Sequence, residues 1–149
     1  MIRVKPSSTS SRNRVEVSVE VIHSPSHSGP RQLFYIYFIT VRNLGSNRVQ
    51  LLRRHWNIRS GDGGAQTVDD EGVIGQQPVL EAGEEFVYNS GVPISRAPGW
   101  MGGYYTFRAL DIDGEQEFFR VPIADFELYI PEEELLEEPR PNPSPRVLN

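Results

Sequence analysis

The fold class of this chain is decided by the stretch VEVSVEV, which occupies residues 15–21. Every second residue is valine, and the residues between the valines are polar or charged. This two-residue period is typical of a β-strand with one buried and one solvated face, whereas an amphipathic helix repeats its apolar residues every three or four positions. The stretch therefore predicts a strand that covers one side of a core.

Further strands follow outward along the chain. Residues 33–41 (LFYIYFITV) are rich in aromatic and β-branched side chains, which favours a strand buried on both faces. The turn-forming sequence NLGSN separates them from a predicted strand at residues 49–58, and the glycine-rich residues 60–84 are predicted to be a long connection. Later strands are predicted at residues 85–89, 104–111, 117–121 and 126–130, with Asp113-Gly114 as a hairpin turn.

Seven or eight strands separated by turns, with no convincing helix, predict an all-β protein. An antiparallel sandwich or a barrel fits this pattern, and the long connection favours the sandwich because it divides the strands into an early and a late set. The 149 residues suit one domain. We place it at residues 14–130, between a flexible N-terminal segment (1–13) and an acidic, proline-rich flexible tail (131–149), since both ends have too little apolar surface to offset ordering entropy.

Composition excludes several function classes. The chain has no cysteine, which rules out disulfides, thiolate catalysis and cysteine-ligated metal sites. Its formal net charge of −5 disfavours nonspecific nucleic-acid binding. The apolar run at residues 33–41 is far shorter than the roughly 20 residues that span a bilayer, and no apolar segment follows the basic start as in a secretory signal. We expect a cytoplasmic protein that binds neither nucleic acid nor membrane.

The residues also offer no catalytic constellation. There is no G-x-S-x-G motif, and the paired carboxylates at residues 84–85 and 111–113 bracket turns or strand ends. The acidic residues 69–71 and the histidines at 23 and 27 lack the spacing of a metal site. We therefore expect no enzyme, no catalytic residue, no metal ligand and no cofactor.

Several sequence blocks resemble the bacterial ApaG family, in order and with family-like spacing from about Val15 to Leu128. The blocks are VQLLRRHWNI at residues 49–58, GVIGQQPVL at 72–80, YNSG at 88–91 and GWMGGY at 99–104. The resemblance implies an immunoglobulin-like, fibronectin type III-like sandwich. It also implies a link to cobalt and magnesium resistance, and related eukaryotic domains look like protein-binding units. Together these expectations describe a non-enzymatic binding module for an unknown protein partner.

Two segments are candidates for contact with that partner. Trp100, Met101 and Tyr104 lie in a glycine-rich segment whose aromatic composition is typical of interface hot spots. Arg53 and His55 belong to the one basic cluster of the core and would share a strand face opposite Trp56. The alternatives are a tryptophan folded over one end of the sandwich and a cross-strand salt bridge to a neighbouring acid.

A small-ligand site is the alternative function. Gly72 and Gly75, with Arg53 or His55, could bind pyrophosphate, a nucleotide or a divalent metal through backbone N–H groups. Asp70 stands where the phosphate-binding pattern has its first glycine, and no helix is predicted after the loop. A structural loop with positive φ at Gly72 and Gly75 is the simpler interpretation.

Two further expectations concern association. Unpaired sheet edges make a homodimer plausible, since an open edge is a template for strand pairing. The acidic segment EEELLEE at residues 132–138 is either an inert solubilising tail or an element that folds on a basic partner.

Overall fold

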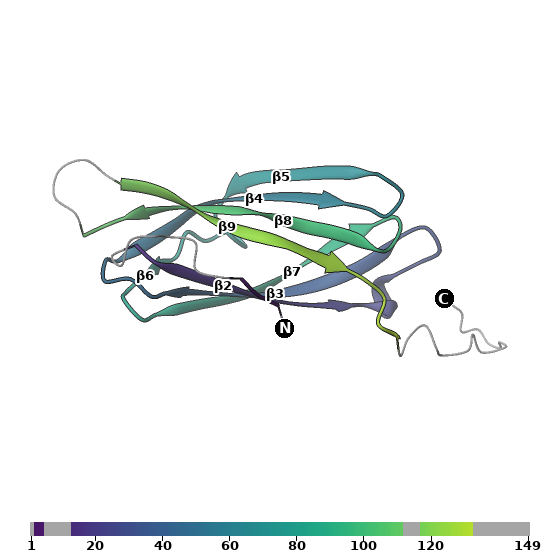
Figure 1. The fold of residues 1–149 in the computed structure, drawn as a ribbon, viewed down its shortest axis with the longest axis horizontal. Coiled ribbons are helices and arrows are strands. Elements are labelled where there is room, and N and C mark those ends of the chain that lie inside the picture. Colours follow the sequence, from purple (N-terminus) through teal and green to yellow (C-terminus); the bar gives the residue numbers. More distant parts are fainter. Residues whose placement is uncertain (1, 5–12, 112–116, 133–149) are drawn as a thin grey trace.

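The computed structural model describes residues 2–4, 13–111 and 117–132. These residues form two antiparallel sheets packed face to face, which Figure 1 shows as two layers. The predicted all-β antiparallel sandwich is thereby confirmed. No helix in the described residues is long and apolar enough to cross a membrane.

The first sheet has the order β1-β2-β3-β7, and the second has the order β5-β4-β8-β9 with the short strand β6 paired to β4. The strands of the first sheet are β1 (Ile2–Val4), β2 (Val15–His23), β3 (Leu33–Asn43) and β7 (Glu85–Ile94). Those of the second are β4 (Val49–Arg59), β5 (Ala65–Glu71), β6 (Val79–Leu80), β8 (Gly99–Ala109) and β9 (Glu117–Leu128). A short 3-10 helix, η1 (Pro25–His27), precedes β3.

The core lies between the two sheets and follows the alternation of the strands. Val15, Val17 and Val19 of β2 are almost completely buried, as the period of two predicts. Trp56 of β4 is 2% exposed. Its ring contacts Tyr37 of the opposite sheet and packs edge-on against aromatic rings of β8 and β9. The β4 strand therefore has one apolar face that is fixed in the sandwich.

Several elements differ from the sequence-based expectations, three of them in or near the second sheet's outer strands. Residues 65–71, predicted as part of a long connection, form the edge strand β5, whose exposed polar side chains give no apolar alternation. Residues 117–128 form one strand where two were predicted. The strand β8 begins at Gly99 rather than at residue 104, so the segment around Trp100 is regular strand.

The ends of the chain were expected to be flexible. Ile2–Val4, within the N-terminal segment, pair with β2 as strand β1. The hairpin turn at Asp113-Gly114 lies outside the described residues, as does the tail beyond Glu132.

Candidate functional site

The outer face of the second sheet carries a row of polar and aromatic side chains across its four long strands. The backbone register places His55 of β4 opposite Asp69 of β5 on one side and opposite Tyr104 of β8 on the other. Arg53 lies two residues before His55 on the same face, and Arg120 of β9 lies beyond β8. We call Arg53, His55, Asp69, Tyr104 and Arg120 the outer-face cluster.

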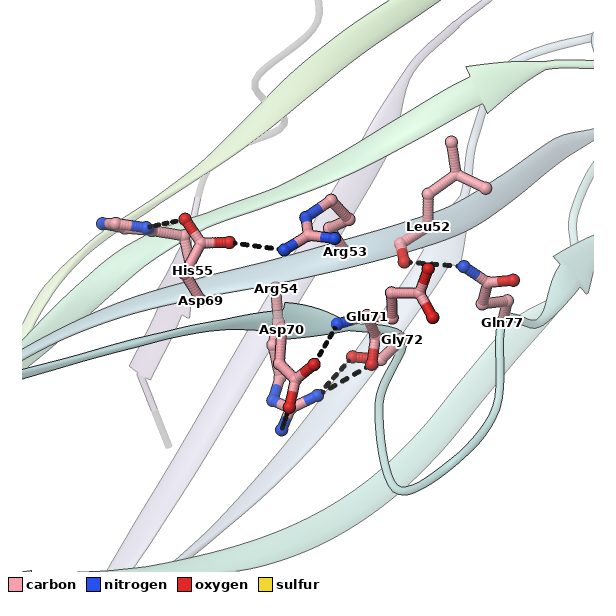
Figure 2. Close-up of polar contacts among 9 residues, drawn as sticks. All are labelled: Leu52, Arg53, Arg54, His55, Asp69, Asp70, Glu71, Gly72 and Gln77. Atoms are coloured by element: carbon pink, nitrogen blue, oxygen red, sulfur yellow. Dashed lines mark hydrogen bonds and ion pairs between the residues drawn. The ribbon is translucent and has the colours of Figure 1, made fainter.

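Asp69 joins the two basic side chains of β4. Nη2 of Arg53 donates a hydrogen bond to its Oδ1 at 3.0 Å, and Nδ1 of His55 lies 3.2 Å from its Oδ2, as Figure 2 shows. Hydrogen bonds from Arg53 and then from His55 hold the pKa of the Asp69 carboxyl below its ordinary value. This is the cross-strand salt bridge that the sequence left open as the simpler interpretation of Arg53 and His55.

Tyr104 is held between two other members of the cluster. Its ring stacks on the His55 ring, with 4.6 Å between centroids and 11° between planes. The Arg120 Cζ lies 4.3 Å from the centroid of the same ring. Because β8 lies between β4 and β9, the imidazole and the guanidinium reach Tyr104 from two different neighbouring strands. Among the described residues, Arg120 has no carboxylate partner.

The cluster borders a shallow groove of about 490 Å³. Thr106 of β8 lies in register between Arg53 and Arg120, and Phe118 of β9 is 58% exposed. The residues that line the groove are Arg53, Arg54, His55, Asp69, Tyr104, Thr106, Phe118, Phe119 and Arg120. On the outer face two arginines, Arg53 and Arg120, and His55 share the groove with a single aspartate, Asp69, so the groove is basic although the chain as a whole is acidic.

Arg54 points to the other side of β4 and holds the glycine loop. A register shift between Leu51 and Arg53 marks a bulge in this strand. Nη1 of Arg54 donates to the carbonyl oxygens of Glu71 at 3.0 Å and Gly72 at 2.8 Å (Figure 2). The guanidinium group of Arg54 is therefore bound to backbone carbonyl oxygens of the loop.

The loop from Gly72 to Gln76 is closed by its own backbone. The Gly72 N–H donates to Leu52 O at 2.7 Å, and Val73 and Gln76 exchange N–H···O bonds of 2.8 and 2.9 Å. The predicted positive φ is confirmed at both glycines, +63° at Gly72 and +78° at Gly75. Arg53 and His55 contact Asp69 rather than this loop, so the four candidates of the small-ligand site do not converge.

The other partner-binding candidates, Trp100, Met101 and Tyr104, lie in different parts of the fold. Trp100 is 42% exposed and stands opposite Arg59, outside the groove. Met101 is 1% exposed, so its candidacy as a contact residue is wrong: the alternation of β8 turns it into the core. Tyr104 joins Arg53 and His55 in the groove.

Sequence reasoning missed Arg120 and Phe118. They stand about 65 residues along the chain from Arg53, and only the pairing of β8 with β9 brings them to the same face. The available signal was their alternation with Phe119 and Val121 in a predicted strand, which places Phe118 and Arg120 on one side.

Metal ligands do not gather in the described part of the chain, where no group of three or more His, Cys, Asp or Glu side chains could hold an ion. The histidines at 23 and 27 instead lie near serine hydroxyls beside η1, with His27 Nδ1 at 2.7 Å from Ser24 Oγ and His23 Nε2 at 3.2 Å from Ser28 Oγ.

Comparison with known proteins places this architecture in a family. Residues 23–109 match the family model of the ApaG domain. Protein ApaG of Deinococcus radiodurans is 42% identical over 116 residues, which cover 78% of this chain and 88% of that protein. Protein ApaG of Klebsiella pneumoniae is 42% identical over 79% of this chain and 93% of its own length.

The fold agrees with this match. A crystal structure described as that of an ApaA protein from Bordetella pertussis superposes with a TM-score of 0.76 and 36% identity, covering 81% of this chain and 97% of that one. The sequence match and the fold match therefore agree. The chain belongs to the ApaG domain family.

Proposed function

We propose that this chain is a non-enzymatic, cytoplasmic binding module that recognises a protein partner through the groove on the outer face of β4, β8 and β9. The observation that carries the proposal is the composition of that groove: arginine and aromatic side chains lie together on an open sheet face, and Phe118 is 58% exposed. Arginine and large aromatic residues are the types most enriched at energetically important positions of protein interfaces.

The arrangement of the cluster supports the proposal further. Tyr104 is stacked on His55 and covered by Arg120, while Arg53 and His55 share Asp69. Side chains that are ordered by their neighbours lose less conformational entropy when a partner binds. The groove is thus a preorganised surface, and the proposal assigns it neither a cofactor nor a reaction.

The alternative small-ligand site finds less support. A phosphate at Gly72 and Gly75 would need free backbone N–H donors, yet the amides of Gly72, Val73 and Gln76 donate within the chain. Arg54 Nη2 also lies 3.8 Å from Asp70 Oδ2, so a carboxylate already stands beside the cation nearest the loop. These contacts favour a structural loop that fixes the end of β5.

Two finer expectations belong to the proposal. A link to cobalt or magnesium homeostasis would run through the recruited partner. Self-association through a sheet edge stays a prediction, and the edge strand β5 carries three consecutive acids, Asp69, Asp70 and Glu71, which would repel a second copy of the same strand.

In-cell photo-crosslinking tests the proposed surface. A photoreactive phenylalanine analogue at Phe118 should crosslink to a discrete protein of the same cell. The matched control is Val87 on β7, which has 59% exposure and lies in the other sheet. A protein that crosslinks at 118 and not at 87 supports the proposal. Equal crosslinking at both positions, or none above background at 118, contradicts it.

A further inference from the structure

We propose that the groove selects an acidic segment of its protein partner, with a carboxylate seated over Thr106 between Arg53 and Arg120. This inference rests on the proposed function and adds the chemistry of the bound segment. It is carried by the register of the three strands, by the unequal pairing of the two arginines, and by the position of Phe118.

The register places two guanidinium groups around one position. Arg53, Thr106 and Arg120 are directly opposite one another on β4, β8 and β9. Neighbouring strands are about 4.8 Å apart, so the two arginine backbones are separated by roughly 10 Å, with Thr106 midway. Arginine side chains are long enough to converge on a carboxylate above Thr106, whose hydroxyl can donate from below.

Within the described residues, the positive charges of the groove are not fully paired with acidic side chains. Arg120 contacts the face of Tyr104 and has no acidic partner among the described residues. Arg53 shares Asp69 with His55, so Asp69 keeps a partner when Arg53 turns toward a ligand. By contrast, Arg42, Arg48 and Arg59 of the same sandwich pair with Glu85, Asp111 and Asp125. The complementary occupant is therefore an anion rather than a cation.

Phe118 offers an apolar contact for a second side chain of the bound segment. It stands opposite Arg108, two residues along β8 from Thr106, on the same outer face as Arg120. Alternate residues of an extended chain are about 6.8 Å apart, which is also the spacing from Thr106 to Arg108 along β8. An extended segment lying along β8 would place an acidic side chain between the arginines and an apolar side chain, two positions away, against Phe118. For a segment that runs antiparallel to β8, and so passes Arg108 before Thr106, the pattern reads apolar-x-acidic.

An NMR titration of the full chain tests this inference. The probe is the peptide Gly-Leu-Ser-Glu-Ser-Glu-Gly, and its counterpart has glutamine in place of both glutamates. We expect the acidic peptide to shift the amide signals of Arg53, Thr106 and Arg120, and to bind at least about tenfold more tightly than the glutamine peptide, because a charge-assisted hydrogen bond is worth about twice a neutral one. Raising the salt concentration should weaken the binding.

Variants locate the effect. Arg120→Gln and Arg53→Gln should each weaken the binding about tenfold. Arg59→Gln is the matched control, because Arg59 lies on the same face of β4, has the same charge and pairs with Asp125 away from the groove. It should leave the affinity unchanged within about twofold. Thermal unfolding of each variant confirms that the comparison is made on folded protein.

Three results would overturn the inference. The first is equal binding of the acidic and the glutamine peptide, and the second is an equal loss in Arg59→Gln, which would show only a net-charge effect. The third is tighter binding of inorganic pyrophosphate than of the acidic peptide, measured by displacement of the peptide. That result would make the groove a small-anion site. Crosslinking at Phe118 combined with failure of the peptide titration would leave the protein-binding proposal intact and remove only the acidic specificity.

Discussion

Gly72 and Gly75 share a left-handed backbone but differ in the space around them. A Cβ on Gly72 would collide with the carbonyl oxygen of Gln76, whereas a Cβ on Gly75 would meet nothing within 4 Å. We expect Gly75→Ala to lower the free energy of unfolding by about 1 kcal/mol, the cost of a left-handed alanine. Gly72→Ala should cost roughly 3 kcal/mol, because steric overlap adds to that cost. Urea denaturation measures both, and equal losses would contradict the assigned clash.

Ile74 occupies the other unusual backbone position of this loop. Its φ is +42°, and it is 55% exposed. Val73 and Gln76 pair on either side of a turn whose two central residues are Ile74 and Gly75. Both central residues have positive φ, which is the type I′ pattern, and Asn-Gly is strongly preferred there. We expect Ile74→Asn to raise the free energy of unfolding by about 1 kcal/mol. Ile74→Val keeps the β-branch and should bring no gain, and a similar gain in both variants would refute the strain argument.

At the scale of elements, one ionisable side chain, Asp69, contributes to the pairing of β4 with β5. The pKa of Asp69 is lowered by hydrogen bonds from Arg53 and His55, so the native state binds this proton more weakly than the unfolded chain. Its stabilising contribution is present above the ordinary value of 3.8 and is lost as the pH falls through the lower native pKa.

The consequence is a pH-dependent difference between the wild type and Asp69→Asn. The wild type should have the higher urea midpoint near pH 7, by a small margin because the pair is exposed, and the two curves should merge once the pH falls below the native pKa of Asp69. Arg53→Gln should shrink the same difference. A difference that persists unchanged in acid would show that the carboxylate charge is not its source.

The strands differ in how well the sequence predicts them. The β2 and β4 strands were predicted because an apolar residue recurs on the buried side, and the faces of Arg53 and Trp56 followed from it. The β5 strand was missed because only Val68 among its seven residues is partly buried, so an edge strand leaves no apolar period. Met101 was misplaced because the start of β8 is rich in glycine, which hides the alternation.

For the whole molecule, a period of two predicts the sandwich but not which strands become neighbours. The groove depends on β9 lying next to β8 and on the register that aligns Arg53, Thr106 and Arg120. This register is set by cross-strand pairs that are distant in sequence, so no local sequence pattern predicts it. The positive φ of Gly72 and Gly75 could be predicted, because glycine within a turn sequence is the residue that adopts this conformation most readily.

The two sheets are also joined by a polar contact inside the core. The hydroxyls of Tyr88 on β7 and Tyr105 on β8 are 2.5 Å apart, and both side chains are buried. Burial raises the pKa of both phenols, so both stay neutral in the native state. If one hydroxyl is removed, the other stays buried without a partner and its desolvation cost is no longer compensated. The effects of removing the two hydroxyls are therefore expected to be coupled.

A double-mutant cycle measures this coupling between the sheets. Tyr88→Phe and Tyr105→Phe should each lower the free energy of unfolding by about 1–3 kcal/mol, because each leaves one hydroxyl without the other. The double variant should cost clearly less than the sum of the two, since it removes both polar groups, and the expected interaction energy is about 1 kcal/mol. Additive losses would mean that the hydroxyls do not depend on each other and that apolar packing alone holds the two sheets at this point.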